Sequence, residues 1–377
     1  MKLQKKITLS IVSLILFFGT LATITTYSLT RNEFSKQLTT NLVDNTYIQS
    51  QEVYQILKQS QDISYMLANR PVVRQFFTDQ SNKELKSQIE EHYLDGFNMS
   101  NRYSAIYLMD NTGVTIFSTD PRFISQNYGT RSYYIQALYG KSSAEINLGL
   151  TSNELGYYFS SPIFSLEDQS KVLGVAVVKL NPNAIEESLL EHQKSEYNIM
   201  LTDKHGVVVV ASDKKKLFSS LGELSPKSIE ELRLNNTYGK ENFDVLDYDV
   251  LQQEINNQSI SQKTIKITDE VDNEEEIVSI SKIKDFPLYI VFEGNFELIS
   301  QISLRTSLVI AAFVAVAAIL SVFVITFVLR FFMQKQQKDE NEIVQRTKEL
   351  ESLNKLMIGR ELKMIDLKKQ LINKNTT

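Results

Sequence analysis

Two long apolar runs without a charged side chain stand near the two ends of the chain. The runs are residues 7–29 and 307–329, and each is 23 residues long. A helix needs about 20 residues to cross the hydrocarbon core of a membrane. Because a helix satisfies its backbone hydrogen bonds internally, both runs are predicted to be transmembrane helices. A cleaved signal peptide is the alternative for the first run, but its apolar region would usually be only about 7–15 residues long.

Basic residues beside the two runs indicate their orientation. Cytoplasmic segments carry an excess of Lys and Arg close to the membrane. Residues 1–6 and 330–377 are therefore predicted to be cytoplasmic, and residues 30–306 to lie outside the cell. The basic residues are Lys2, Lys5 and Lys6 before the first run, and Arg330, Lys335 and Lys338 after the second. This pattern predicts a multi-pass protein of the bacterial cytoplasmic membrane.

Residues 30–97 carry the pattern of a helical stalk and linker. Residues 31–77 contain no Gly and a single proline, Pro71. Apolar side chains recur there at helical spacing, which predicts one long helix rising from the membrane. Pro71 is predicted to interrupt this helix and to begin a short one, and a further helix is expected up to residue 97.

The region that follows contains an internal repeat. Residues 106–120 (IYLMDNTGVTIFSTD) and 199–213 (IMLTDKHGVVVVASD) align without gaps and share Ile, Leu, Asp, Gly, Val and Asp at equivalent positions. Each is predicted to be a two-stranded hairpin with Gly in the turn. The repeat predicts two similar α/β subdomains, residues 98–194 and 195–303, and so an α+β fold. Further strands are predicted at residues 156–164, 172–180, 264–268, 276–283 and 288–292, and helices at 182–194 and 226–234.

The tail, residues 330–377, carries a heptad pattern. Apolar residues seven positions apart are Ile343, Leu350, Met357, Met364 and Leu371. This spacing is typical of a parallel coiled-coil seam, here imperfect because Arg346 and Arg360 fall in the same set. The seam predicts a homodimer, or a heterodimer with a kinase-bearing receptor that has a similar helix.

Composition narrows the classes of function. The formal net charge is -5, which argues against a general nucleic-acid binder. The chain has no Cys, so a disulfide scaffold and a thiolate metal site are excluded. Its three His residues lack a recognisable companion motif for catalysis or metal binding. We therefore expect a protein that is not an enzyme and needs no cofactor.

Five short motifs in the first subdomain resemble a known family of sensors. They are FSTD at 117–120, RSYY at 131–134, LGLTS at 148–152, GYYFSSP at 156–162 and GVAVVK at 174–179. Their order resembles the extracytoplasmic region of C4-dicarboxylate sensor histidine kinases, and residues 32–294 resemble a double Cache (dCache) domain. The resemblance implies two tandem PAS-like (Cache) subdomains, with the ligand bound in the first, membrane-distal one.

The resemblance also implies a set of ligand-binding residues. The family's carboxylate-holding positions fall on Arg131, Tyr133, Thr151, Ser160 and Lys179, and the same motifs make Tyr134 and Tyr157 candidates. The chemistry is consistent with this role, because Arg pairs bidentately with a carboxylate and hydroxyl groups donate to its remaining lone pairs.

Lys179 favours one class of ligand over another. A buried Lys needs an anionic partner, which could be a protein carboxylate such as Glu145 or Asp120, or a ligand. In amino-acid-binding relatives a position on this strand is typically an Asp that holds the ammonium group. A Lys there favours a dicarboxylate or another small anionic acid over an amino acid or amine.

The features together predict a transmembrane sensor that binds a small carboxylate outside the cell and signals to the cytoplasmic coiled coil. In the resembled kinases a catalytic core follows such a helix, whereas this sequence ends at Thr377, so we expect no output domain. The alternatives are a membrane-anchored solute-binding or adaptor subunit of a transporter or separate kinase, and an amino-acid or amine sensor.

Overall fold

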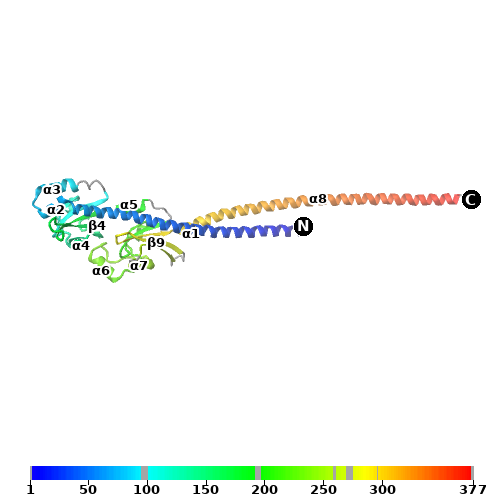
Figure 1. The fold of residues 1–377 in the computed structure, drawn as a ribbon. Coiled ribbons are helices and arrows are strands. Elements are labelled where there is room, and N and C mark those ends of the chain that lie inside the picture. Colours follow the sequence, from blue (N-terminus) through cyan, green and yellow to red (C-terminus); the bar gives the residue numbers. More distant parts are fainter. Residues whose placement is uncertain are drawn as a thin grey trace. The chain divides into compact units, whose positions relative to one another are not determined.

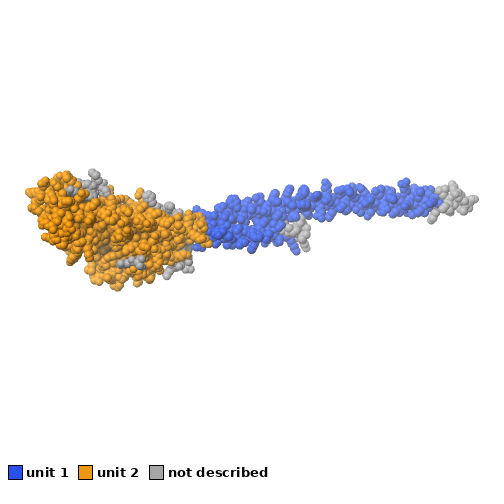
Figure 2. All heavy atoms as spheres, in the orientation of Figure 1, with its two compact units in different colours: residues 1–31, 301–377 blue, residues 32–300 orange. Residues whose placement is uncertain are grey.

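The computed structural model describes residues 2–94, 101–191, 197–257, 260–268, 275–294 and 296–374. The chain forms two compact units, shown in different colours in Figure 2. One unit contains residues 1–31 and 301–377, and the other contains residues 32–300. The domain boundaries predicted at 97/98 and 194/195 lie outside the described residues.

Two very long helices carry the apolar runs. Helix α1 spans Lys2–Ala68 and α8 spans Phe296–Lys374 (Figure 1). Each is long and apolar enough to cross a membrane, and the two flank the folded region. Within the first unit they approach closely at Gly19, where an added Cβ would lie 2.2 Å from Cγ1 of Val314. Such small residues allow transmembrane helices to pack backbone against backbone.

The first subdomain of the second unit is a five-stranded antiparallel sheet in the order β2-β1-β5-β4-β3. The strands are β1 (Tyr103–Asp110), β2 (Thr115–Ser118), β3 (Ser143–Leu148), β4 (Leu155–Phe164) and β5 (Val172–Leu180). The accompanying helices are α2 (Pro71–Thr78), α3 (Lys83–Gln88), the π-helix η1 (Ile89–Leu94), the 3-10 helix η3 (Pro121–Phe123), α4 (Ser132–Leu138) and α5 (Pro182–Leu190). The predicted break at Pro71 is present, since Pro71 begins α2.

The second subdomain repeats this topology in the order β7-β6-β10-β9-β8. Its strands are β6 (Tyr197–Asp203), β7 (Val208–Ala211), β8 (Gln262–Thr268), β9 (Glu275–Lys282) and β10 (Leu288–Gly294). Its helices are the 3-10 helix η4 (Lys214–Lys216), α6 (Pro226–Leu234) and α7 (Asp249–Asn256). Both predicted hairpins, β1-β2 and β6-β7, are present, so the repeat in the sequence does correspond to a repeat in the fold.

Helix α1 provides one core for both subdomains. Its buried residues Leu42, Val53 and Leu57 belong to a single apolar cluster that includes Phe159 of the first sheet and Ile290 of the second. The outer face of each sheet has a separate core. Each sheet is therefore apolar on both faces, which explains why its central strands are nearly continuous apolar runs.

Apart from the three-residue helices η3 and η4, the elements that the sequence did not predict are α4, α7 and the edge strand β3. Helices α4 and α7 are 7 and 8 residues long, too short to give a clear helical period. Strand β3 (SAEINL) alternates polar and apolar residues, with Glu145 and Asn147 on one face, and such a short polar strand resembles a loop in sequence.

Gly174 sets the closest packing between β5 and its neighbours. A Cβ added there would lie 2.4 Å from the Met109 carbonyl oxygen and 2.5 Å from the Phe77 ring. We expect Gly174→Ala to lower the free energy of unfolding by about 1–3 kcal/mol, the usual cost of overpacking. Calorimetric unfolding of the full chain in lipid nanodiscs measures the change.

The matched control is Gly359→Ala in α8, where an added Cβ meets nothing within 4 Å. That change should be neutral or stabilising, because Ala favours a helix over Gly by ~1 kcal/mol. Equal effects of the two substitutions would contradict the packing at Gly174.

Candidate functional site

The face of the first sheet that lies away from α1 is lined with tyrosines. Successive side chains of a strand point to opposite faces, so Tyr107 of β1 and Tyr158 of β4 lie on the same side as Lys179 of β5. Helix α4 covers this face with Tyr133 and Tyr134. The same register places two charged side chains on this face, Lys179 of β5 and Glu145 of the edge strand β3, with Tyr158 between them.

Lys179 is fully buried. Its Nζ donates to Ser152 Oγ at 2.6 Å and lies 5.9 Å from the centre of the Phe123 ring and 5.7 Å from that of Tyr158. Burial lowers the pKa of Lys179, although the exposed Glu154 acts in the opposite direction. Over the described ranges, no ion pair joins Lys179 to a carboxylate.

Neither of the two expected protein partners holds Lys179. The Asp120 carboxylate instead pairs with Arg122 at 2.7 Å. The Glu145 carboxylate accepts hydrogen bonds from neutral groups of Ser132, Gln136 and Asn147. Neither residue therefore forms an ion pair with Lys179 in the described structure, although the charge of Asp120 still acts to raise the pKa of Lys179.

The tyrosine hydroxyls on this face form short hydrogen bonds. Tyr107 and Tyr133 share one at 2.8 Å, and Tyr128 shares one with Thr151 at 2.5 Å. The Tyr133 and Tyr158 rings stack at 5.0 Å. Burial raises the pKa of Tyr107 and Tyr133, so these hydroxyls stay protonated and remain able to donate to an acceptor.

Arg131 lies at the start of α4, with 8% of its surface exposed. Its guanidinium donates to the carbonyl oxygens of Leu148 and Asn235, the latter at 3.1 Å. Asn235 follows α6, so Arg131 connects the two subdomains. In this structure the guanidinium is bonded to backbone carbonyls and to no described carboxylate.

The structure brings most of the predicted site residues together. Arg131, Tyr133, Tyr134, Thr151, Ser160 and Lys179 all lie on or beside the tyrosine-lined face. Ser160 donates to the Tyr133 carbonyl oxygen at 2.8 Å, and the Tyr134 hydroxyl donates to the Asp110 carbonyl oxygen at 3.1 Å. These two are therefore occupied by internal hydrogen bonds.

Tyr157 is the predicted residue that does not join this group. It neighbours Tyr158 on β4, so it points to the opposite face and packs in the cluster of α1. The sequence reasoning missed Phe123, Ser152 and Tyr158, which contact Lys179. It also missed Tyr107 and Tyr128, which pack on the same face. Strand alternation counted from Lys179 through its β4 partner Tyr158 could have identified the correct tyrosine.

The second subdomain provides an internal comparison for Lys179. Strands β5 and β10 pair with β1 and β6 in the same register, which places Lys179 and Glu293 at equivalent positions. Glu293 is also buried, but it forms an ion pair of 2.9 Å with Lys216 and accepts from Tyr248 at 3.1 Å. Burial alone would lower the pKa of Lys216, yet Glu293 and Tyr248 raise it. Within the described residues, the buried charge is thus held in an ion pair in the second subdomain and not in the first.

The tyrosine-lined face bears no sign of metal chemistry. In the described part of the chain no group of three or more His, Cys, Asp or Glu side chains could hold a metal ion. The donors around Lys179 are hydroxyls and a cation, which suit an acceptor with negative charge.

Comparison with known proteins identifies the family. The model of the Cache domain family dCache_1 matches residues 27–301. The C4-dicarboxylate transport sensor protein DctB of Pseudomonas aeruginosa is 27% identical over 186 residues, which cover 48% of this chain and 29% of DctB. The protein of the same name from Rhizobium meliloti is 24% identical over 150 residues, or 39% of this chain and 23% of that protein. The match thus spans less than a third of the length of either relative.

A solved structure agrees in fold. The sensor domain of the histidine kinase DctB from V. cholerae aligns with a TM-score of 0.55 and 24% identity, covering 69% of this chain and 97% of that domain. At this identity the likeness concerns the fold alone. Because the family match spans the greater part of its residues, this chain belongs to the Cache domain family of sensors.

Proposed function

We propose that this chain is a transmembrane sensor whose first subdomain binds a small dicarboxylate outside the cell. The observation that carries the proposal is the buried Lys179, which forms no ion pair with a carboxylate among the described residues, at the position where the second subdomain pairs Glu293 with Lys216. An unpaired buried charge is costly, and an anionic ligand would offset that cost. The names of the two DctB relatives are consistent with a dicarboxylate.

In the proposed complex, Lys179 binds one carboxylate and the protonated tyrosines donate to its free lone pairs. Arg131 is the candidate for the second carboxylate, because a bidentate charge-assisted pair is stronger than bonds to neutral carbonyls. Its guanidinium would then leave the carbonyl oxygens of Leu148 and Asn235. Since Asn235 belongs to the second subdomain, ligand binding would change the contact between the subdomains.

We propose that α1 and α8 pass this change to the cytoplasm. Helix α1 packs against both sheets and continues into the first apolar run, and α8 continues from the second run into the heptad segment. A ligand can shift the signalling equilibrium only by its different affinities for the two states. In this proposal the chain acts by binding alone, with both termini in the cytoplasm and no catalytic step of its own.

Lys179→Met tests the site directly. We expect the Kd for succinate to rise about thirtyfold or more, because losing one partner of a buried charge pair costs ~2–5 kcal/mol. Isothermal titration calorimetry of the full chain in nanodiscs measures the Kd. Without ligand, the variant should be at least as stable as the parent, because it removes an unpaired buried charge.

The control is Lys171→Met, which removes an exposed Lys just before the same strand and should leave the Kd unchanged. Unchanged succinate binding in Lys179→Met would sink the site assignment. Binding of amino acids or amines in place of succinate would retain a sensor but rule out a dicarboxylate.

The pH dependence follows from the lowered pKa of Lys179, whose ordinary value is 10.5. As pH rises through the lowered value, the folded chain loses this proton before the unfolded chain does. The ligand-free protein should therefore gain stability between the lowered pKa and 10.5, whereas succinate affinity should fall. Titrations at several pH values, compared with Lys179→Met, measure both trends. The prediction fails if the parent and the variant show the same slopes.

Dimerisation through the heptad segment is a further part of the proposal. Ile343, Leu350, Met357 and Met364 are all more than half exposed on α8, as expected for a seam that a second copy covers. The chain has no Cys, so any disulfide that forms in a single-cysteine variant must involve the introduced residue. In membranes, Leu350→Cys should form an intermolecular disulfide much faster than Ser352→Cys, two residues away. Equal rates would argue against a seam.

A further inference from the structure

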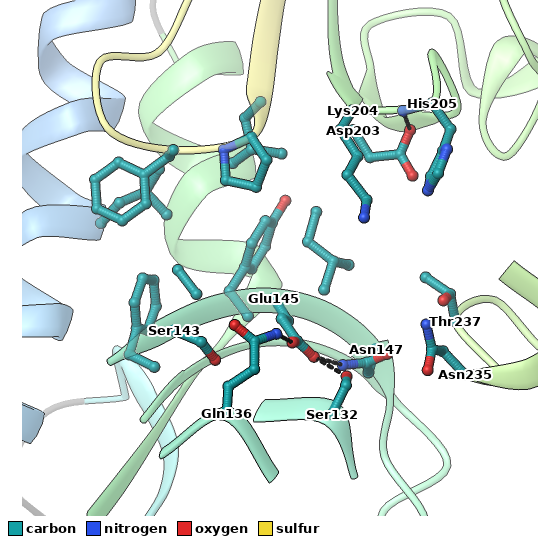
Figure 3. Close-up of a pocket in the computed structure, with 18 of the residues that line it drawn as sticks. Ser132, Gln136, Ser143, Glu145, Asn147, Asp203, Lys204, His205, Asn235 and Thr237 are labelled. Atoms are coloured by element: carbon teal, nitrogen blue, oxygen red, sulfur yellow. Dashed lines mark hydrogen bonds between the residues drawn. The ribbon is translucent and has the colours of Figure 1, made fainter. Parts of the chain in front are cut away.

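The second unit contains a cavity that is separate from the Lys179 cluster. It has a volume of about 430 Å³ and lies between the edge strand β3 of the first subdomain and loops of the second (Figure 3). Glu145 and Asn147 line it from β3, Asp203 from the end of β6 and His205 from the β6-β7 turn. Of the residues predicted to bind ligand, Tyr157 alone lines it.

Two carboxylates face this cavity without a cationic partner. Glu145 is half-buried and bonds only to neutral donors, including Gln136 Nε2 at 2.8 Å. Asp203 is buried and accepts from two backbone N–H groups and from the Tyr238 hydroxyl at 2.9 Å. In the described residues no Lys or Arg forms an ion pair with either of them. Glu145 and Asp203, which belong to different subdomains, thus both present a carboxyl group to the same cavity.

The remaining charged groups leave the cavity acidic. Lys204 and Glu231 form an ion pair with each other, and Asp285 adds another carboxylate to the lining. Burial lowers the pKa of His205, so this imidazole is neutral at pH 7. Burial raises the pKa of Asp203, but the lining still has three further carboxylates against one lysine, and its field favours a cation.

One buried polar group in the lining is unsatisfied. Tyr157 is 2% exposed, and its hydroxyl has no hydrogen-bond partner among the described residues. Buried hydroxyls are rarely left so, and a bound molecule is one explanation. The same part of the lining is apolar, with Leu57 of α1, Phe159 of β4 and Phe286 beside β10.

The backbone of β3 supplies further acceptors. β3 is an edge strand, and in an antiparallel sheet every second residue points its N–H and C=O away from the partner strand. The Leu148 N–H does so and donates to the Thr237 carbonyl oxygen at 2.9 Å. Ile146, two residues earlier, faces the same way and lines the cavity. Its carbonyl oxygen could accept from an ammonium group.

We propose that this cavity is a second ligand site, which takes a small organic cation with an ammonium group on an apolar body. The ammonium lies at Glu145, between the acids of the two subdomains, and the apolar body covers Leu57, Phe159 and Phe286. Such a ligand contacts both subdomains and α1, so it would act on the same conformational equilibrium as an anion at Lys179. The site does not depend on the proposed anion site.

The probes are benzylamine, benzyl alcohol and benzoate, three aromatic molecules of similar size. At pH 7 they are a cation, a neutral molecule and an anion, respectively. Saturation-transfer NMR with the full chain in nanodiscs should detect benzylamine at the protein in clear preference to the other two. Glu145→Gln should weaken benzylamine binding at least about tenfold, the change that one modest charge interaction produces. Glu187→Gln, which removes an exposed acid on α5 outside the cavity, should leave it unchanged.

Tyr157→Phe gives an independent measurement. Because its hydroxyl has no partner, its removal should leave the ligand-free Tm equal or higher, while benzylamine binding weakens severalfold. The proposal is overturned if benzylamine binds no better than benzyl alcohol, or if Glu145→Gln and Tyr157→Phe both retain the parent affinity. Preference for benzoate would assign the cavity to anions instead.

Discussion

A charge removed from water has to be neutralised, and this requirement distinguishes the two subdomains more than their folds do. Both have the same strand order and the same pairing register, and both bury an ionisable side chain at the same position of the same strand. In the second subdomain the carboxylate of Glu293 is held by Lys216, so that site is complete. In the first, Lys179 contacts a serine hydroxyl and aromatic rings, and no ion pair within the described residues joins it to a carboxylate. This difference in charge pairing between two subdomains of the same fold is the basis for proposing that the first one binds an anion.

Helix α1 relates this local chemistry to the rest of the molecule. It packs on one face of both sheets, and its apolar residues join the two subdomains into one core. A displacement of either subdomain would therefore act on α1, which continues without interruption into the first apolar run. Tightly packed cores transmit such displacements because they have little free volume to absorb them.

Much of the fold could be predicted because its signals are long or repeated. The apolar runs, the Pro71 break and the two hairpins have clear physical causes in helix length, proline geometry and strand alternation. The short helices α4 and α7 and the polar edge strand β3 could not be predicted, since each has too few residues to show a period. For the candidate site, a charge at the end of an apolar strand was visible in the sequence, but the burial of Lys179 and its surroundings depend on which face of the sheet each side chain occupies. Tyr157, a candidate by resemblance, lies on the opposite face of β4 from Lys179, and Arg131 bonds to carbonyl oxygens that come near it only in the folded chain.

The alternation of β4 has a consequence for how the molecule can change through evolution. Tyr157 and Tyr158 are adjacent, yet one lines the cavity and the other lies beside Lys179. Strand β4 thus lies between two compartments, the cavity on one face and the surroundings of Lys179 on the other. Insertion or deletion of a single residue in it would exchange the two faces, giving each compartment the tyrosine of the other. Relatives that differ by one residue in this strand should therefore alter both compartments at once, whereas point substitutions can tune each one separately.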